Sequence, residues 1–170
     1  PYTTLFRSVI VRTRWDPFAL FNAQSSEGVS ASLLLDAYTQ RGGAIGIDAD
    51  YEVPKAYGHL DGYLMYDTGD DEPGGRKEIE PEGEARGLIH WRHRHYLPES
   101  WEISAEVGYV SDPTFLEEFF TEDAYTDKPW ETSIYAKKQV EDWAFTFLLR
   151  YDLMDFMPQL TQLQTPGYTV

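Results

Sequence analysis

The stretch Ser100–Phe120, SWEISAEVGYVSDPTFLEEFF, decides the fold class. From Trp101 to Tyr109, apolar and polar side chains alternate strictly over about ten residues. A strand of a soluble sandwich usually stops after about five or six residues, whereas a tilted strand that crosses a bilayer needs about 9–11. The length of the alternation, and an aromatic residue at each end of it, therefore favour a membrane-barrel strand. The apolar positions are Trp101, Ile103, Ala105, Val107 and Tyr109.

The composition excludes several classes of protein. No stretch approaches 18 uninterrupted apolar residues, so a transmembrane helix is not predicted, whereas a barrel is compatible with the mean hydropathy of -0.48. The formal net charge of -15 argues against a nucleic-acid partner, which needs a basic surface. The absence of cysteine excludes disulfides, zinc–thiolate sites and thiol catalysis.

The same alternation recurs along the chain and predicts an all-β fold, an antiparallel meander of about nine strands. Because the sequence starts without Met and ends in the apparent start of a strand, we interpret residues 1–170 as one fragment of a β-barrel domain, a partial and open barrel. The predicted strands are 5–14, 29–40, 45–53, 56–66, 85–96, 101–109, 130–140 and 142–154, with a further strand beginning at the C-terminus.

The two faces of these strands differ in polarity. Carboxylates that alternate with apolar and aromatic residues in 45–53 are incompatible with a dry core and fit a water-filled lumen or a solvated sheet face. The last hairpin carries a continuous apolar face that suits lipid. The candidates for the lumen are Asp48, Asp50, Glu52, Glu102 and Glu106, and those for the lipid face are Trp101, Ile103, Val107, Trp143, Phe145 and Phe147.

Two connections stand out between the strands. Residues 67–84 are acidic and rich in Gly and Pro, which predicts a long mobile loop. Residues 112–128 lose the alternation, which predicts a short helical insertion with Asp112 as the N-cap and Pro113 at the first helical position. Glycine at Arg41-Gly42-Gly43 supplies the positive φ of a tight turn.

No constellation in the sequence predicts catalysis, a metal or a cofactor. A metal site is one reading of the three histidines His90, His93 and His95, because His93 and His95 share a strand face and His59 is a potential neighbour. Against it stand Arg92 and Arg94 in the same run, whose fixed positive charge opposes a cation. Paired carboxylates such as Asp48 and Asp50 have no nucleophile or partner base near them. The basic cluster Arg86, Arg92 and Arg94 with His90 is interpreted as charge balance against acidic strands, or else as a site for phosphate or carboxylate groups.

Three elements resemble one family. They are Tyr38-Thr39-Gln40-Arg41-Gly42-Gly43, followed by a strand ending Asp48-Ala49-Asp50-Tyr51; Trp91-Arg92-His93, followed by Trp101; and Tyr109–Phe119, with the sequence Val-Ser-Asp-Pro-Thr-Phe from Val110. Their order and spacing resemble those of LptD (the OstA family), the lipopolysaccharide-assembly proteins. The resemblance covers about residues 15–153, and the third element, with Ser111, Asp112 and Pro113, is the most specific.

The resemblance implies a barrel in the outer membrane of a Gram-negative bacterium. It implies lipopolysaccharide as the transported partner, an LptE-like plug lipoprotein, contact with outer-membrane lipid, and a lateral gate between the first and last strands. Pro17 is the candidate for a gate proline, because a proline removes a ladder hydrogen bond. Gln40 departs from the Arg-Arg-Gly pattern of the family, and the family's cysteines are absent.

Two alternatives share parts of this pattern. A porin-like channel has alternating strands and an acidic lumen but no reason to carry the Val-Ser-Asp-Pro-Thr-Phe element. A soluble β-sandwich or lipocalin-like binding protein would pack its apolar faces together. The second alternative differs from a barrel in one observable. In a barrel wall, Trp143, Phe145 and Phe147 face outward from a curved single sheet, whereas in a sandwich they pack against a second layer.

Overall fold

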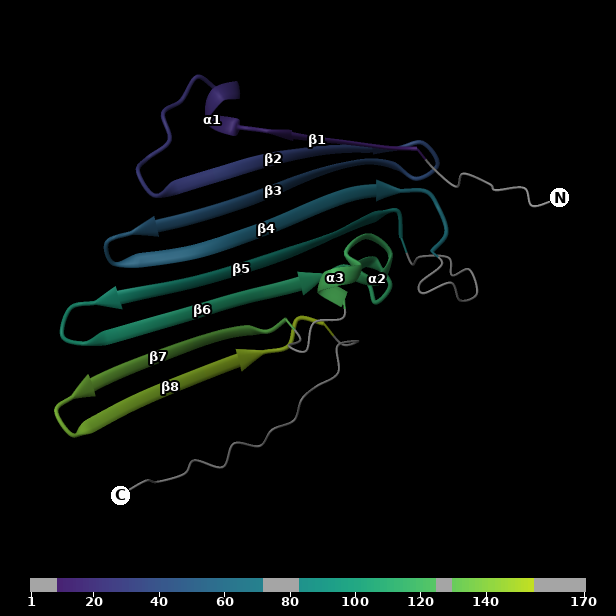
Figure 1. The fold of residues 1–170 in the computed structure, drawn as a ribbon. Helices are drawn as coiled ribbons and strands as arrows, with labels where there is room; N and C mark the ends of the chain where they lie inside the picture. The colour runs from purple at the N-terminus through teal and green to yellow at the C-terminus, as the bar shows by residue number, and fades with distance from the viewer. Residues whose placement is uncertain (1–8, 72–82, 125–129, 155–170) are drawn as a thin grey trace.

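The chain folds as a single antiparallel sheet (Figure 1). A computed structural model describes residues 9–71, 83–124 and 130–154. Its eight strands pair only with their neighbours in sequence, in the order β1 to β8, and the sheet stays open, which confirms the predicted all-β meander. The strands are β1 Ile10–Trp15, β2 Val29–Tyr38, β3 Gly42–Val53, β4 Ala56–Asp67, β5 Ala85–Leu97, β6 Trp101–Val110, β7 Thr132–Val140 and β8 Trp143–Tyr151.

The predicted strands agree with these elements. Each of the eight internal ranges overlaps one strand of the structure, and the expected C-terminal strand falls outside the described residues. The apolar run after Trp15 forms a single helical turn, α1 (Pro17–Leu20), because Asp16 Oδ1 accepts hydrogen bonds from the amides of Phe18 and Ala19. Among the described residues, no helix has the length and apolar character that crossing a membrane requires.

Pro17 occupies the first position of α1, where its missing N–H leaves no hydrogen bond unmade. It therefore lies outside the ladder, and the expectation that it removes a ladder bond is wrong. β1 is nevertheless an edge strand of the described sheet.

The connections differ in length between the two ends of the sheet. Tight turns at 54–55, 98–100 and 141–142 lie at one end, on the left of Figure 1, together with the α1 connection. The long connections 68–84 and 111–131 lie at the other end, beside the short turn at 39–41. We call these the turn end and the loop end. Gly42 has φ 118°, as predicted for this turn, and a Cβ there would strike the carbonyl oxygen of Tyr66.

The core lies at the loop end, on one face of the sheet only. There α2 (Phe115–Phe119) and α3 (Thr121–Ala124) fold back onto strands β4 to β6 (Figure 1). α2 begins at Phe115 with Thr114 as its N-cap residue, so the predicted N-cap at Asp112 and helix start at Pro113 are wrong. Asp112 Oδ1 nevertheless accepts hydrogen bonds from the amides of Thr114 and Phe115 at 3.2 and 3.0 Å. The buried residues of this core are Tyr38, Tyr63, Met65, Leu88, Val110, Phe115, Leu116 and Met154.

Candidate functional site: a two-faced sheet with a buried ion cluster

The strand register sorts the side chains into an apolar face and a polar face. Ile47, Gly62, Ile89 and Tyr109 stand opposite one another in successive strands and so share the apolar face. On this face Ile45 is 49% exposed and Leu64 is 59% exposed. No second sheet or helix of the described chain covers it.

Aromatic residues border the apolar face at both ends. Tyr66, Tyr109 and Tyr151 lie toward the loop end, and Trp101 and Trp143 lie toward the turn end. Tyr and Trp favour positions where one part of the ring is in an apolar medium and the other in water. An apolar band between two aromatic borders is the pattern that a membrane-spanning sheet presents to lipid.

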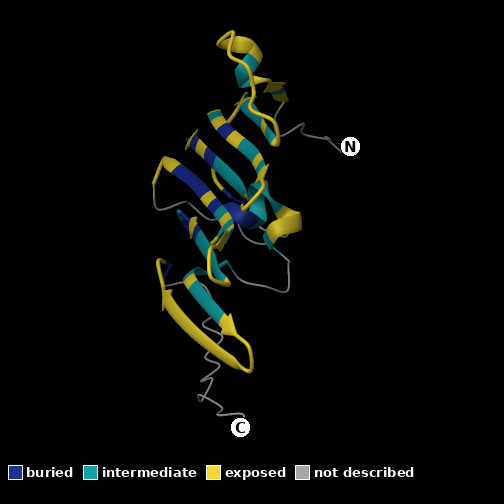
Figure 2. Ribbon diagram, turned by 90° about the vertical axis from the view of Figure 1, so that its left-hand side faces the viewer, coloured by how far each residue is buried: buried dark blue, intermediate teal, exposed yellow. Residues whose placement is uncertain are grey.

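The six candidates for the lipid face all lie on the apolar face. Trp143, Phe145 and Phe147 are 83%, 63% and 53% exposed, and Figure 2 shows β8 exposed along its whole length. Contact between this face and lipid stays a prediction. The other three candidates, Trp101, Ile103 and Val107, share the face and are half-buried.

The five candidates for the lumen all lie on the polar face. A register row runs across this face through Asp50, His59, Arg92, Glu106 and Ser133, each in a different strand. Charged side chains of both signs therefore occur in one row across the sheet, which a dry core does not accommodate. The other candidates, Asp48, Glu52 and Glu102, occupy the same face on β3 and β6.

The histidines do not form one cluster. His93 and His95 point to the apolar face, where Trp91 Nε1 and His93 Nδ1 contact the hydroxyl of Tyr51 at 3.2 and 2.5 Å. His90 points to the polar face and stacks on Trp130 with ring centroids 4.4 Å apart. His59 also lies on the polar face, so the expected proximity of His59 to His93 and His95 on one face is wrong.

The described residues best placed to share a cation are Asp48, His59 and Asp61, whose ligand atoms lie within 4.8 Å of one another. Both ring nitrogens of His59 are already engaged, Nδ1 by Asp50 at 2.7 Å and Nε2 by Asp61 at 2.6 Å. A guanidinium nitrogen of Arg14 lies 3.4 Å from Asp48. The donor atoms are therefore occupied by protein partners.

A cluster of buried ions lies at the loop end of the polar face. Arg86 is 1% exposed, and its guanidinium donates to Asp67 at 2.7 Å, to Asp71 at 2.6 and 2.8 Å, and to Asp112 at 2.8 and 2.9 Å. Two of these contacts are bidentate, the geometry that makes arginine–carboxylate pairs strong. One side chain thus joins the ends of β4 and β5 to the segment after β6.

Arg41 extends this ion cluster to the β2–β3 turn. Its guanidinium donates to Asp67 at 3.0 Å, to Glu118 of α2 at 2.6 Å, and to Asp71, and it lies over the ring of Phe119 at 4.7 Å. Every buried side-chain nitrogen and oxygen in the described part of the chain has a hydrogen-bond partner. The ion cluster is therefore complete among its own side chains, and it holds α2 against the sheet.

Two carboxyl groups of the ion cluster, those of Asp71 and Asp112, are held in their ionised form. Burial alone would raise the pKa of Asp71, but hydrogen bonds from Arg86, Thr114 and Arg41 outweigh it and lower that pKa below its ordinary value. Burial likewise raises the pKa of Asp112, and a hydrogen bond from Arg86 lowers it. The hydroxyl of Ser111 also donates to Asp112, at 2.7 Å, and the net effect is a lowered pKa.

The ion cluster gives physical roles to several residues of the sequence resemblance. Arg41, Ser111 and Asp112 belong to it, whereas Trp91 and His93 lie on the apolar face, away from the cluster, and contact Tyr51. The mobility predicted for the acidic loop is wrong for its first residues, because Asp67 and Asp71 are 2% and 0% exposed. Residues 72–82 of that loop, and 125–129 of the insertion, lie outside the described residues.

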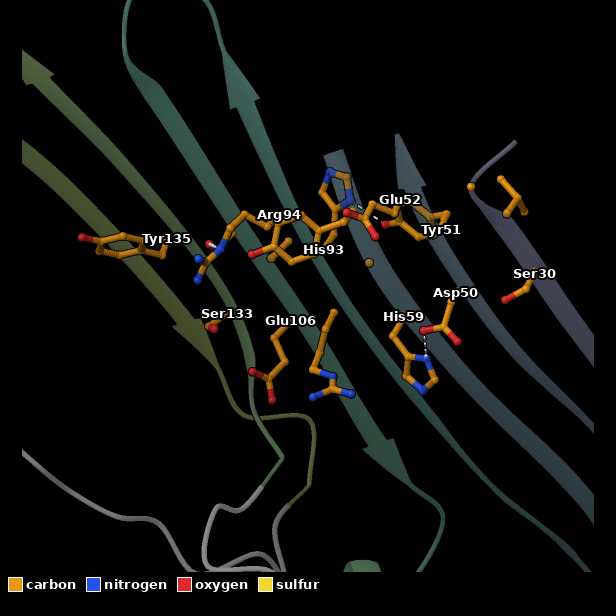
Figure 3. Close-up of a pocket in the computed structure, with 17 residues that line it drawn as sticks. Ser30, Asp50, Tyr51, Glu52, His59, His93, Arg94, Glu106, Ser133 and Tyr135 are labelled. Carbon is orange, nitrogen blue, oxygen red and sulfur yellow. Dashed lines mark hydrogen bonds and ion pairs between the residues drawn. The ribbon is translucent and has the colours of Figure 1, made fainter. Parts of the chain in front are cut away.

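A groove of about 960 Å³ crosses the polar face toward the turn end (Figure 3). It is lined by side chains of β2 to β7, among them Asp50, Glu52, His59, Arg92 and Arg94. Figure 3 shows Asp50 and His59 in contact with each other, on the opposite side of the groove from Ser133 and Tyr135.

The chain was compared with known proteins. No protein-family model matches it. No curated protein matches it either.

Proposed function

We propose that this chain forms part of the wall of an outer-membrane β-barrel that transports lipopolysaccharide, as in the LptD family. The observation that carries the proposal is the separation of the sheet into an exposed apolar face with aromatic borders and a charged face. In this arrangement the apolar face contacts membrane lipid, and the polar face lines a water-filled conduit. The proposed role is transport, with no enzymatic step and no cofactor.

The exposed apolar face disfavours a soluble sandwich or lipocalin-like binder. Trp143, Phe145 and Phe147 project from a single sheet, and burying such a side chain is worth about 1.5–3 kcal/mol. A soluble protein would gain that energy by packing a second layer on them, and the described residues contain no such layer. A bilayer supplies the same gain.

The ion cluster favours the lipopolysaccharide-assembly type over a porin-like channel. The Val-Ser-Asp-Pro-Thr-Phe element, which a simple channel does not need, supplies Ser111, Asp112 and Thr114 to the cluster, and its Phe115 lies in the core. Through these contacts α2 is fixed over the polar face of the sheet. The partners that follow from this proposal are lipopolysaccharide, outer-membrane lipid and an LptE-like plug lipoprotein, at the Gram-negative outer membrane.

Photo-crosslinking in cells tests this function. A photoreactive phenylalanine at Ser133 reports on the polar face, and the same residue at Ala136 reports on the apolar face of the same strand. We expect Ser133 to form adducts with lipopolysaccharide that disappear when lipopolysaccharide synthesis is stopped, since they depend on lipid in transit. Ala136 should form adducts with membrane lipid throughout. Lipid adducts at Ala136 with no lipopolysaccharide at Ser133 would contradict the transport function while leaving the membrane placement intact.

A further inference from the structure

Four polar side chains of β3 and β4 form two facing pairs on the polar face. Asp48 lies directly opposite Asp61 in the register, and Asp50 lies directly opposite His59. Side chains that face each other in this way have Cβ atoms about 4.5–5.5 Å apart, and like charges in such a pair destabilise the sheet. The pair Asp48 and Asp61 therefore concentrates negative charge beside the ring of His59.

The ring of His59 contacts a carboxylate on each side. Its Nδ1 lies 2.7 Å from Asp50 Oδ1, a contact drawn in Figure 3, and its Nε2 lies 2.6 Å from Asp61 Oδ2. A neutral imidazole has one N–H donor and one lone pair, and an ionised carboxylate only accepts. One of the two contacts therefore lacks a donor unless a further cation, either a proton or a metal ion, joins the ring to the carboxylate.

The two contacts of His59 suit the two roles that a metal-binding histidine needs. A carboxylate that accepts from Nδ1–H fixes the tautomer in which Nε2 carries the lone pair, and Asp50 is placed to do this. Nε2 then faces Asp61, and the ligand atoms of Asp48, His59 and Asp61 all lie within 4.8 Å of one another. Three ligands thus converge from two paired strands.

A cavity of about 480 Å³ provides room for an ion beside these strands. His59 and Asp61 line it together with Asp123 of α3 and with Trp130. The three ligand side chains are each half-buried, so they are held by the sheet and still reach the cavity and solvent. Water can therefore complete the coordination of an ion at this position.

We propose that Asp48, His59 and Asp61 bind a divalent transition-metal ion, with zinc as the ion of best fit. One imidazole nitrogen and two carboxylate oxygens are ligands of an open zinc site, in which water takes the fourth position. Tetrahedral ligands at about 2.0–2.2 Å from zinc lie about 3.3 Å from one another, so each side chain needs to move by about 1 Å or less. The bound ion cross-links β3 to β4, and the inference does not depend on the transport function.

Two arginines near the site set its selectivity. A guanidinium nitrogen of Arg14 lies 3.4 Å from Asp48, and Arg92 lies directly opposite His59 in the register. Their positive charge disfavours ions that are held by oxygen ligands alone, such as magnesium and calcium, whereas zinc gains from the bond to the imidazole nitrogen. The site should therefore select zinc over calcium, and Arg14→Ala, which releases Asp48, should tighten zinc binding.

Calorimetric titration of the whole chain, folded in detergent and free of any polyhistidine tag, with zinc tests this site. We expect a single zinc ion to bind, and His59→Ala and Asp61→Asn to abolish measurable binding. Asp50→Asn should weaken binding about 10–100-fold, as expected when a residue that orients a ligand is lost. The matched control is His95→Ala, which removes a histidine on the apolar face and should leave zinc binding unchanged. Circular dichroism establishes that each variant is folded.

Competition between ions separates a zinc site from an acidic surface. We expect zinc to stay bound in a hundredfold excess of calcium, and cobalt in place of zinc to give a visible absorption spectrum that His59→Ala removes. The proposal is overturned if the folded chain does not bind zinc, if calcium displaces zinc at equal concentration, or if His95→Ala weakens binding as much as His59→Ala. Intact transport-dependent adducts at Ser133 together with a failed zinc titration would refute the metal site alone.

Discussion

The ion cluster at the loop end and the β7–β8 hairpin show opposite ways of stabilising one sheet. In the ion cluster, Arg86 and Arg41 bind buried carboxylates, and every buried side-chain nitrogen and oxygen of the described chain finds a hydrogen-bond partner within the protein. In the hairpin, all nine residues of β8 are exposed, including Trp143 and Phe147. The first region is complete by itself, whereas the second leaves its apolar side chains uncovered by the described chain.

The difference shows where the protein depends on its environment. The ion cluster joins β4, β5, α2 and the β2–β3 turn by contacts that a bilayer does not change, because they lie on the polar face under the helices. The hairpin has no helix over either face among the described residues, and its apolar side chains gain burial only from lipid or from further protein. Substitutions in the two regions should therefore differ in whether their effects depend on the membrane.

The largest effect is expected from Arg86→Ala. The substitution leaves Asp67, Asp71 and Asp112 buried without their main cation, and breaking a buried ion pair costs about 3–5 kcal/mol. We expect a loss of this size in the free energy of unfolding, measured by denaturant titration with tryptophan fluorescence. The control is Arg14→Ala, which removes an exposed ion pair worth at most about 1 kcal/mol. Equal losses in the two variants would show that the cluster does not hold the sheet together.

A smaller effect, confined to membranes, is expected from Phe147→Arg. Phe147 lies at the middle of β8 on the apolar face, where a charge facing lipid costs about 2–4 kcal/mol. Thr146→Arg places the same charge on the polar face of the same strand and should cost much less. Folding efficiency in vesicles measures both. Equal tolerance of the two arginines would argue that β8 does not face lipid.

The smallest effect is the dependence of stability on acid. The folded pKa of Asp71 and of Asp112 is lowered from an unfolded value of about 3.9, so the folded state binds fewer protons than the unfolded state between the two values. Their contribution is complete above about pH 4 and is lost as the pH falls through the folded pKa. Unfolding titrations at several pH values should show this decline, and Asp112→Asn should flatten it. A stability that does not fall under acid would exclude ionised carboxylates in the cluster.

The sequence predicts the sheet well and the ion cluster poorly. Alternation in segments such as 45–53 and 101–109 follows directly from the pleat, so both the strands and the residues that share a face could be predicted. The ion cluster could not, because Asp71 and Arg86 are 15 residues apart and the sequence pattern does not show that they meet. Composition also misled at that point, since acidic residues beside glycine and proline predict mobility, although buried arginines fix Asp67 and Asp71 in place.

The same limit applies to Pro17. A proline near a strand predicts a missing ladder bond, but the cap formed by Asp16 moves Pro17 into α1. Conversely, the sequence alone predicts that His90 lies on the other face from His93 and His95, because even and odd positions of a strand point to opposite faces. The position of His59, on the face opposite to His93 and His95, depends on the register between β4 and β5.

Scanning β8 with single spin labels, in the chain reconstituted into lipid bilayers, tests most directly whether the apolar face meets lipid. Labels at successive positions from Trp143 to Tyr151 report their access to oxygen, which concentrates in lipid, and to a water-soluble nickel reagent. We expect oxygen access to peak at the odd positions, including Phe145 and Phe147, and nickel access to peak at the even positions, including Thr146. Nickel access at the odd positions equal to that at the even positions would contradict a membrane wall.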